Sequence, residues 1–375
     1  MKIAVLCPHF EDTGGVREVV ARVAREHLAV GNRVVVLTRT HSHEPAPSPS
    51  PEGVLVWRVP MAPAPYAGAG RRATQRFVRR FARGGWTLAT RLRSVGPDVV
   101  AVHCSKFYAP WVMVARLATR APVVVHLHNA DRTADGPPSP FWSRRLLQAA
   151  RHVIAVSPAV GEFAVRMHPP LAGHVSIIRN GVDPGEFDGV EPETRPYPYL
   201  LAVGRLAPQK GFDILFEALG LAARPMPLVI AGDGPERDRL LARATRLGLA
   251  SRVEFLGDVP RERVKRLLRG AAAIVMPSRF EGNPLIALEA MQAGAPLIAS
   301  DIPGLPEELS DGVTGVLVPP EDACALAGAL DRLLGDPANT QRLGRAAALA
   351  AQHMPTWRAV GGSVLAVYER VAHST

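Results

Sequence analysis

The sequence predicts an α/β protein with two Rossmann-like β/α/β domains. Short apolar runs alternate with helical patterns along most of the 375 residues, and this alternation is typical of parallel sheets covered by helices on both faces. A stretch rich in Pro, Gly and acidic residues, 184–198, has no periodicity and predicts an interdomain linker. We therefore expect an N-terminal domain over residues 1–183 and a C-terminal domain over 199–354, each with a buried core.

The N-terminal half contains a series of predicted strands. Each is a run of apolar, largely β-branched residues between turn residues, and the runs cover residues 2–7, 33–38, 54–59, 98–102, 122–127, 152–156 and 175–178. A helical pattern over 16–29 follows the first strand. The Pro- and Ser-rich segment 41–52 predicts a loop or a hairpin connection inside this domain.

The C-terminal half repeats this pattern. Its predicted strands cover residues 199–203, 227–231, 252–256, 272–276, 296–300 and 314–318. Helical patterns separate most of these strands, at residues 210–220, 236–247, 261–269 and 284–293. A last amphipathic helix is predicted over 355–371, because Trp357, Val360 and Val364 fall on one side of it.

Positive charge is concentrated in the first half of the chain. Residues 1–180 contain 24 Lys and Arg against 10 Asp and Glu, whereas residues 181–375 contain 20 against 24. The basic residues are densest over 71–93, where Phe77 and Phe81 begin an apolar stripe among arginines. This pattern is typical both of a helix on an anionic membrane surface and of a solvated helix. Sparse aromatic residues and the lack of a nucleic-acid-binding motif argue against nucleic acid as a partner.

Several classes of protein are disfavoured by composition. The three cysteines Cys7, Cys104 and Cys324 lie far apart and lack metal-ligand spacing, which argues against a disulfide framework and against a zinc site. The apolar run at the N-terminus ends in Pro and predicts a first buried strand rather than a signal peptide. No apolar run reaches the roughly 20 residues of a membrane-spanning helix. We expect a cytoplasmic protein, either free in solution or peripheral at the inner membrane face.

The segment FEGNPLIALEAM, residues 280–291, predicts a helix with an anion site at its start. Asn283 is a favourable N-cap, since its side chain accepts a hydrogen bond from a free N–H, and Pro284 suits the first helical position. The open N–H groups near Leu285 and Ile286, together with the positive end of the helix dipole, attract an anion.

Two carboxylates flank this helix start. Glu281 lies in the loop before the helix, and Glu289 lies in its second turn between apolar neighbours. An exposed loop acid is the alternative for Glu281, whereas a buried Glu289 requires a hydrogen-bonding partner. Two acids beside an anion site suit a ligand that carries both phosphate and hydroxyl groups, and a nucleotide sugar is such a ligand.

The segment GRLAPQKG, residues 204–211, contributes cations to the same half of the chain. Gly204 ends a predicted strand, and Arg205 and Lys210 flank a short loop that leads into a helix. Two cations in such a loop can hold a diphosphate and stabilise the charge that grows on it as it leaves. A pair of ordinary surface cations is the alternative.

Other unusual residues also follow predicted strands, where ligands of open parallel sheets bind. Gly14 and Gly15 follow the first strand and form a loop whose N–H groups can approach a phosphate closely, although a plain turn explains a Gly-Gly pair equally well. His103 and His128 end two strands of the N-terminal half, and Gly257 ends one of the C-terminal half. A histidine at a strand end is often structural.

Taken in order, these motifs resemble the family 4 glycosyltransferases of the GT-B type. The resemblance runs along most of the chain, and its motifs are GGV (14–16), PVVVHLH ending at His128, AVS (155–157), NGVD (180–183), GRLAPQKG (204–211), GDGP (232–235), FLG (255–257), the two glutamates of 281–289, SDIPGLPEEL (300–309) and DGVTGVLVPPED (311–322). It implies a GT-B fold, in which two Rossmann-like domains face each other across a cleft. It also implies that the C-terminal helix, 355–375, crosses back to the N-terminal domain.

The resemblance implies a retaining transfer from a nucleotide-diphospho sugar that needs no metal and no cofactor. Arg205 and Lys210 would hold the diphosphate. Glu289 would bind the ribose, Glu281 would contact the phosphate and sugar part, and His128 would touch the donor sugar. The Gly14–Gly15 loop would close over the phosphates from the other domain.

Two positions depart from the usual family pattern, and both leave the donor sugar open. His126 stands where a small polar residue is common, and Asn283 stands where an aromatic residue or Ser is frequent. The default expectation is UDP-GlcNAc or UDP-glucose as donor. GDP-mannose is the alternative, with a lipid or glycan acceptor.

The acceptor is expected to bind the first domain through a small-molecule, sugar or lipid-linked hydroxyl. Candidate acceptor residues there are Glu11, Asp12, His103, Lys106 and Asp131. The positive balance of that half favours an anionic acceptor, while an aminocyclitol antibiotic precursor is an alternative. A UDP-sugar 2-epimerase and a non-catalytic nucleotide-sugar-binding subunit are the alternatives from other classes.

Overall fold

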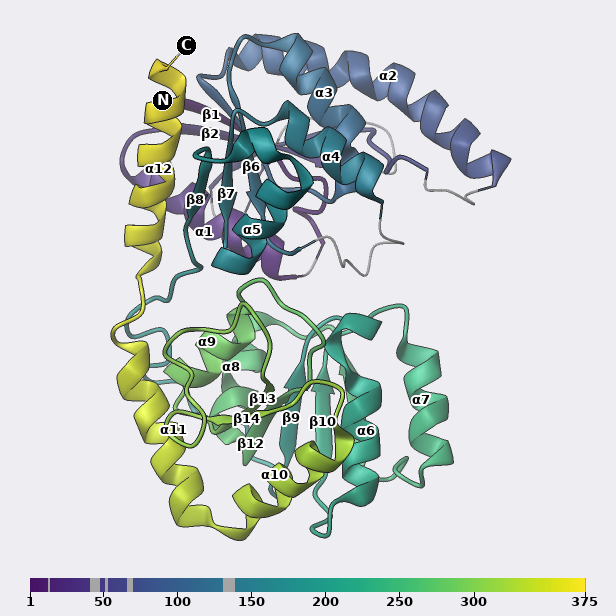
Figure 1. The fold of residues 1–375 in the computed structure, drawn as a ribbon, viewed down its shortest axis with the longest axis vertical. Helices are drawn as coiled ribbons and strands as arrows, with labels where there is room; N and C mark the ends of the chain where they lie inside the picture. Colours follow the sequence, from purple (N-terminus) through teal and green to yellow (C-terminus); the bar gives the residue numbers. More distant parts are fainter. Residues whose placement is uncertain (13, 41–47, 51–52, 66–69, 131–138, 375) are drawn as a thin grey trace. The chain divides into compact units, whose positions relative to one another are not determined.

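The computed structural model describes residues 1–12, 14–40, 48–50, 53–65, 70–130 and 139–374 (Figure 1). The chain divides into two compact units. The first contains residues 1–180 and 357–375, and the second contains residues 181–356. The C-terminal helix α12 (Trp357–His373) therefore belongs to the first unit, as the sequence predicts.

The first unit is built on a mostly parallel sheet with strand order β3-β4-β2-β1-β5-β6-β7-β8. Only β3 runs antiparallel to its neighbour among the named strands. The strands are β1 (Lys2–Leu6), β2 (Arg33–Arg39), β3 (Ser48–Pro49), β4 (Leu55–Val59), β5 (Val99–Val102), β6 (Val123–Leu127), β7 (His152–Ala155) and β8 (Val175–Ile177). The central strands are buried on both faces, which explains why they are continuous apolar runs rather than alternating patterns.

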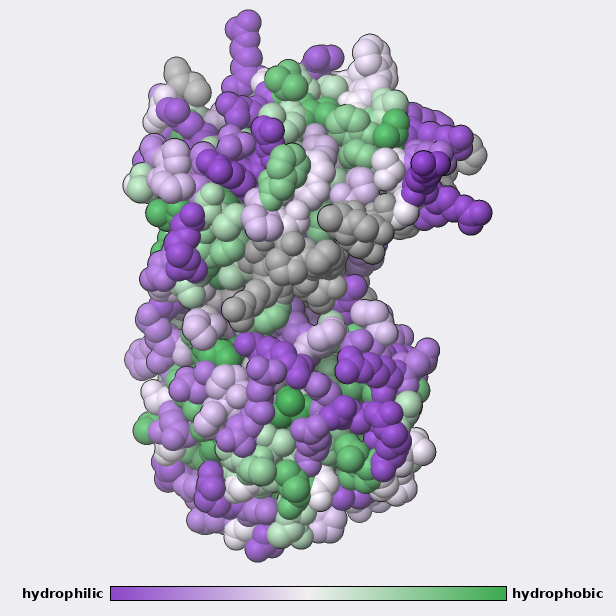
Figure 2. Space-filling view, turned by 45° about the vertical axis from the view of Figure 1, so that its right-hand side comes forward, coloured by the Kyte–Doolittle hydropathy of each residue, from purple (hydrophilic) through white to green (hydrophobic). Residues whose placement is uncertain are grey.

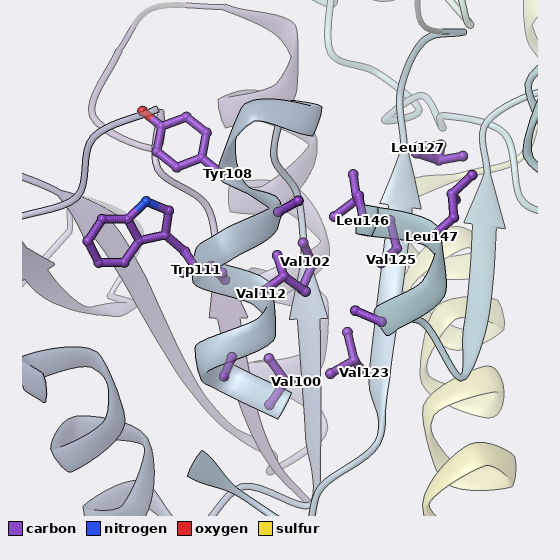
Figure 3. Close-up of a cluster of buried hydrophobic side chains, with 14 of the residues drawn as sticks. Val100, Val102, Tyr108, Trp111, Val112, Val123, Val125, Leu127, Leu146 and Leu147 are labelled. Carbon is purple, nitrogen blue, oxygen red and sulfur yellow. The ribbon is translucent and has the colours of Figure 1, made fainter. Parts of the chain in front are cut away.

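Helices cover both faces of this sheet. On one face lie α2 (Arg71–Val95), α3 (Ala109–Ala118), α4 (Pro140–Ala149) and α5 (Pro158–Met167). Figure 3 shows α3 and α4 over β5 and β6, with Val112 of α3 beside Val102 of β5. On the other face α1 (Gly15–Ala29) packs along α12.

The second unit contains a parallel sheet with strand order β11-β10-β9-β12-β13-β14. Its strands are β9 (Leu200–Val203), β10 (Leu228–Ala231), β11 (Val253–Gly257), β12 (Ala273–Met276), β13 (Leu297–Ser300) and β14 (Val316–Val318). One face carries α6 (Phe212–Leu221), α7 (Arg237–Arg246) and α10 (Ala323–Gly335). The other carries α8 (Arg261–Gly270), α9 (Leu285–Gln292) and α11 (Pro337–Ala351). Both units are thus three-layered α/β structures, as predicted.

Residues 184–198, predicted to be a linker, instead pack on the second unit. Phe187 is part of its core. The Glu193 carboxylate accepts two hydrogen bonds from Arg263 of α8, at 3.0 and 3.1 Å. A single buried aromatic residue and these ion pairs fix a stretch whose composition alone indicates a loop.

The segment 41–52 is only partly covered by the structure. Residues 41–47 and 51–52 lie outside the described residues. The two-residue strand β3 pairs antiparallel with β4, which fits the hairpin alternative.

The basic segment forms α2, and its apolar stripe faces inward. Phe77 stacks on Phe81 with ring centroids 5.4 Å apart, and Phe81 meets Trp111 of α3 edge to face. The apolar side chains that stay in solvent are Val78 and Trp86, which are 58% and 71% exposed. In the part of the chain that the structure describes, no helix combines the length and hydropathy needed to cross a bilayer.

Candidate active site

Each sheet has one point where the strand order reverses. These points lie between β1 and β5 in the first unit and between β9 and β12 in the second. In open parallel sheets, ligands bind at the carboxyl ends of the strands at such a point. In the second unit the loops after β9 and β12 contain Arg205, Lys210 and Glu281. The topology therefore gathers residues that lie about seventy positions apart in the sequence.

Lys210 and Glu281 form an ion pair at this reversal point. The Lys210 Nζ donates to Glu281 Oε1 at 2.6 Å, and the Ser278 hydroxyl donates to the same oxygen at 2.8 Å. The Glu281 side chain is only 7% exposed. Because a buried carboxylate needs such partners, Glu281 is a positioned group rather than the exposed loop acid considered above.

Lys210 ends a short 3-10 turn, Pro208–Lys210, and its aliphatic stem lies over Gly204. A Cβ at Gly204 would stand 3.1 Å from Lys210 Cε, and the φ of Gly204 is 148°. Arg205, on the same loop, has an exposed side chain. The structure thus brings Lys210 to Glu281 and leaves Arg205 at the surface of the loop.

Gly204 and Gly257 belong to a closely packed set of strand ends. The Gly232 N–H donates to the Gly257 carbonyl at 2.8 Å. A Cβ at Gly232 would stand 2.1 Å from the Gly204 carbonyl oxygen. The predicted Gly257 therefore supports this arrangement through its backbone, next to the end of β10.

The start of α9 differs from the prediction. Helix α9 begins at Leu285, and Pro284, with φ −72° and ψ 119°, is its N-cap. Asn283 is buried and precedes the cap, and the N-cap residue Pro284 makes no side-chain capping bond. Pro284 is the cap because its carbonyl accepts the first helical bonds, from Ala287 and Leu288. This shift of the helix start still allows the predicted anion site, since the first N–H groups, of Leu285 and Ile286, have no partner within the helix.

Glu289 is paired with a cation that the sequence analysis did not select. Its Oε1 accepts from Arg261 Nη1 at 2.7 Å, and the second amino group of Arg261 donates to Glu186 at 2.8 Å. A buried carboxylate in the second turn of α9 thus has the partner that its burial requires. Arg261 lies four positions beyond Gly257, and only this proximity to a strand end could have indicated it.

The loops of Lys210 and Glu281 are also joined by their neighbours. The Arg279 N–H donates to the Gln209 carbonyl at 2.8 Å, and Gln209 Nε2 donates to the Phe280 carbonyl at 3.1 Å. Gly211, with φ 65°, packs so closely that a Cβ would stand 2.0 Å from the Pro277 carbonyl oxygen. These contacts link the ends of β9 and β12.

In the first unit the Gly-Gly loop opens α1. Gly14, with φ 147°, is the N-cap of α1, and Gly15 is its first residue. A Cβ at Gly14 would meet nothing within 4 Å among the described residues. The backbone here is open to a ligand, as the prediction requires, and its conformation favours glycine.

The strand-end histidines form a stacked cluster. His103 Nδ1 lies 2.9 Å from His128 Nε2, and the His103 and His126 rings stack with centroids 4.0 Å apart. His126 Nε2 hydrogen-bonds the Tyr368 hydroxyl of α12 at 2.7 Å. Burial lowers the pKa of His128 to about 4, and burial followed by the neighbouring imidazoles lowers the pKa values of His103 and His126 well below the usual range. All three rings are neutral at pH 7.

Two of the acidic acceptor candidates, Glu11 and Asp12, lie in ion pairs. Glu11 accepts from Arg58 Nε at 2.9 Å, and Asp12 accepts from Arg39 Nη2 at 2.8 Å. Asp12 also pairs with His9 at 2.7 Å.

Two further acceptor candidates have other outcomes. Lys106 is buried in the short turn after β5 and lies near the Phe107 ring. Asp131 lies outside the described residues. The described part of the chain contains no group of three or more His, Cys, Asp and Glu side chains that could hold a metal ion.

Comparison with known proteins agrees with this geometry. Residues 186–349 match the family described as "Glycosyl transferases group 1", and residues 13–186 match "Glycosyltransferase Family 4". Glycogen synthase of Mycobacterium tuberculosis is 33% identical over a 312-residue alignment that covers 76% of this chain and 75% of the relative. The α-D-kanosaminyltransferase of Streptomyces kanamyceticus is 28% identical over 84% of this chain and 88% of its own.

Solved structures share the fold over the whole chain. Sucrose-phosphate synthase of Thermosynechococcus elongatus superposes with a TM-score of 0.84 at 23% identity, covering 100% of this chain and 99% of the other. HepE of Anabaena, solved in complex with UDP-glucose, superposes with a TM-score of 0.76 at 21% identity, with coverages of 100% and 99%. The fold, the ordered motifs and the sequence matches agree, and the chain belongs to the family 4-type glycosyltransferases of the GT-B fold.

Proposed function

We propose that this glycosyltransferase moves a hexose or N-acetylhexosamine, with retention of configuration, from UDP-glucose or UDP-GlcNAc to an acceptor hydroxyl. The observation that carries the proposal is the Lys210–Glu281 pair at the reversal point of the second sheet. Beside it begins α9, whose first N–H groups have no partner within the helix. A cation, helical N–H groups and a held carboxylate together match a sugar diphosphate.

The residues of the second unit would stabilise the leaving diphosphate. Lys210, Arg205 and the N–H groups of Leu285 and Ile286 offset negative charge that grows as the bond from the sugar C1 to the diphosphate oxygen breaks. The acceptor oxygen then forms its bond to C1 on the same face, and its proton passes to the departing diphosphate oxygen. Glu281 holds the Lys210 ammonium and is available to a sugar hydroxyl. No protein nucleophile, metal or cofactor enters this scheme.

The ribose and the sugar would be read by other groups. Glu289, which pairs with Arg261, would accept hydrogen bonds from the ribose hydroxyls. His128 stays neutral at pH 7, so it can donate to or accept from a sugar hydroxyl without adding charge.

UDP is the proposed carrier because a fold neighbour binds it. HepE of Anabaena was solved with UDP-glucose, and this likeness at low identity supports the choice without fixing the base. GDP-mannose remains the alternative donor.

The acceptor is proposed to be a polar, hydroxyl-rich molecule bound by the first unit. The positive balance of residues 1–180 favours an anionic acceptor, such as a phosphorylated or lipid-linked sugar. An aminocyclitol is the alternative acceptor. Glu11 and Asp12 would serve a cationic acceptor only after release from Arg58 and Arg39.

Peripheral contact with an anionic membrane is proposed for the solvent face of α2. Figure 2 shows hydrophilic side chains gathered where α2 projects at the upper right in Figure 1. Helix α2 contains eight arginines and no acidic residue. Since its Phe stripe packs inward, contact would depend on these arginines with Val78 and Trp86.

A thermal-shift panel tests the donor. The purified chain is melted with UDP, UDP-glucose, UDP-GlcNAc and GDP-mannose, and a ligand at about 100 times its Kd stabilises by about 2.7 kcal/mol. We expect the UDP compounds to raise Tm. An increase in Tm with GDP-mannose alone would indicate GDP rather than UDP as the carrier. If no compound raises Tm, the proposal is contradicted.

Product analysis separates the other classes of function. Acceptor-dependent release of nucleoside diphosphate is expected of a transferase. A new free sugar epimer formed from donor alone would indicate an epimerase, and binding without turnover on a panel of phosphorylated, lipid-linked and aminocyclitol acceptors would favour a non-catalytic subunit.

A further inference from the structure

Arg279 connects three separate segments of the second unit. Its Nη1 and Nη2 donate to the two carboxylate oxygens of Asp213, both at 2.9 Å. Its Nε donates to Glu321 Oε1 at 2.9 Å, and Nη1 also donates to the Pro208 carbonyl at 2.5 Å. The guanidinium thus uses four of its five N–H donors, in a planar geometry that Lys cannot reproduce.

The two partners of this fork lie beside the residues proposed to hold the diphosphate. Asp213 follows Lys210 by three positions and lies in the first turn of α6. Arg279 precedes Glu281 by two positions in the loop after β12. The Arg279–Asp213 bridge therefore ties the turn that carries Lys210 to the loop that carries Glu281.

The side chain of Arg279 strengthens a backbone contact between the same two segments. Its own N–H donates to the Gln209 carbonyl at 2.8 Å. Without the fork, these loops would be joined by neutral hydrogen bonds, by the packing of Gly211 against Pro277 and by the flexible Lys210 side chain.

The pair is ionic and partly shielded from solvent. Arg279 and Asp213 are 25% and 27% exposed. Burial raises the pKa of Asp213, but the hydrogen bonds and charge of Arg279 lower it by more, so the pKa lies below its ordinary value. The carboxylate is therefore ionised at neutral pH. Bidentate, charge-assisted bonds add geometric specificity as well as energy.

We propose that Arg279 and Asp213 form a positioning clamp that sets Lys210 and Glu281 at the distance needed to hold the β-phosphate of the donor. This inference rests on the proposed function. Neither residue of the clamp touches the substrate; both act through Lys210. The clamp should therefore matter for ligands with a β-phosphate and should matter little for a nucleoside monophosphate.

The test compares binding of UDP and UMP by calorimetry in the full-length chain. The clamp variants are Asp213→Asn, which keeps shape and removes charge, and Arg279→Gln, with Arg279→Lys as the conservative change. The matched control is Arg243→Gln, which removes another arginine pair on α6, that with Glu217. Melting temperature and kcat with the best donor from the panel are measured for each variant.

We expect Asp213→Asn and Arg279→Gln to weaken UDP binding about 10- to 100-fold, with a parallel loss of kcat, because misplacement by about 1 Å is costly. UMP binding should stay close to wild type, Arg279→Lys should recover only part of the loss, and Arg243→Gln should keep the preference for UDP. Melting temperatures similar to that of the control would exclude a general loss of structure.

Other outcomes overturn the clamp in distinguishable ways. Clamp variants that keep the wild-type preference for UDP over UMP would contradict it. Equal weakening of UDP and UMP, with a loss of melting temperature matched by Arg243→Gln, would assign the pair a structural role only. If the wild-type chain itself binds UDP and other nucleoside diphosphates no better than the monophosphates, the proposed function fails first.

Discussion

The two units differ in the charge of the polar side chains that follow their central strands. In the second unit these groups are charged and paired, as in Lys210–Glu281 and Arg261–Glu289. In the first unit the ends of β5 and β6 carry neutral imidazoles, those of His103 and His128. Charged pairs suit a phosphate, whereas neutral rings suit hydroxyl groups that need direction rather than charge. The difference indicates which substrate group each unit handles.

The largest effect should follow the loss of the Lys210 charge. Lys210→Ala removes one stabilising cation from the leaving diphosphate and leaves the buried Glu281 without its ammonium partner. We expect kcat/KM to fall about 10²- to 10³-fold, or about 3–4 kcal/mol. Steady-state kinetics measure it, with Arg342→Ala on α11 as a surface control. Turnover close to wild type would remove Lys210 from the charge-stabilising role.

A smaller effect on a different parameter should follow the loss of Glu289. Glu289→Ala removes the proposed ribose acceptor and keeps the bond from Arg261 to Glu186. A hydrogen bond to a charged group contributes about 1.5–3 kcal/mol, so the Kd for UDP should rise about 10- to 100-fold. At saturating donor, kcat should change less. Calorimetry and kinetics together check this, and a loss confined to kcat would contradict a ribose role.

Acid should destabilise the first unit before the second. The pKa values of His103, His126 and His128 are lowered in the folded state, so the unfolded chain binds more protons once pH falls below about 6.5. Stability is then lost down to the folded pKa, which for His128 is about 4. In the second unit the pKa of Asp213 is lowered in the folded state. Its contribution to stability is therefore retained until the pH falls below about 4, the pKa of this carboxyl in the unfolded chain.

The distribution of tryptophan makes this order measurable. All five Trp residues belong to the first unit, at positions 57, 86, 111, 142 and 357. Each neutral histidine contributes up to about 1.4 kcal/mol per pH unit in this window. Between pH 7 and 5 we expect the urea midpoint by tryptophan fluorescence to fall more than that of the far-UV circular dichroism. A His103→Gln variant should reduce the slope, and equal shifts of both midpoints would contradict the assignment.

The sequence predicted more of the second unit than of the first. Lys210, Glu281 and Glu289 could be selected because charged residues at strand ends and helix starts have a local signal. The histidine cluster could not be predicted as a cluster, since His126 and Tyr368 meet across 242 positions through the packing of α12. Arg261 and Arg279 were missed for the same reason: in a chain rich in arginine, only tertiary contacts distinguish these two.

The predictions differ from the structure where local sequence preference and tertiary packing favour different conformations. The side chain of Asn283 makes it a more favourable N-cap than Pro284. The helix nevertheless begins at Leu285, one residue later than predicted, with Pro284 as its N-cap. The stretch 184–198 looks like a linker by composition, but Phe187 anchors it in the core of the second unit. The pattern of helix α2 fitted both a membrane-surface helix and a solvated helix, and its Phe81 packs on Trp111.

The smallest effect on folding and donor binding should come from the solvent face of α2. A triple change, Arg76→Gln, Arg79→Gln and Arg83→Gln, alters exposed side chains for which the structure gives no ion pair with any described residue. Surface changes of this kind shift stability by about 0.5 kcal/mol or less, so Tm and the Kd for UDP should stay unchanged. Binding to vesicles that contain anionic lipid should weaken by about 1 kcal/mol per arginine removed, and added salt should weaken wild-type binding in the same way. If the wild-type chain does not bind anionic vesicles, the membrane proposal is wrong and α2 is a solvated helix. The positive charge of the first unit would then act only on the acceptor.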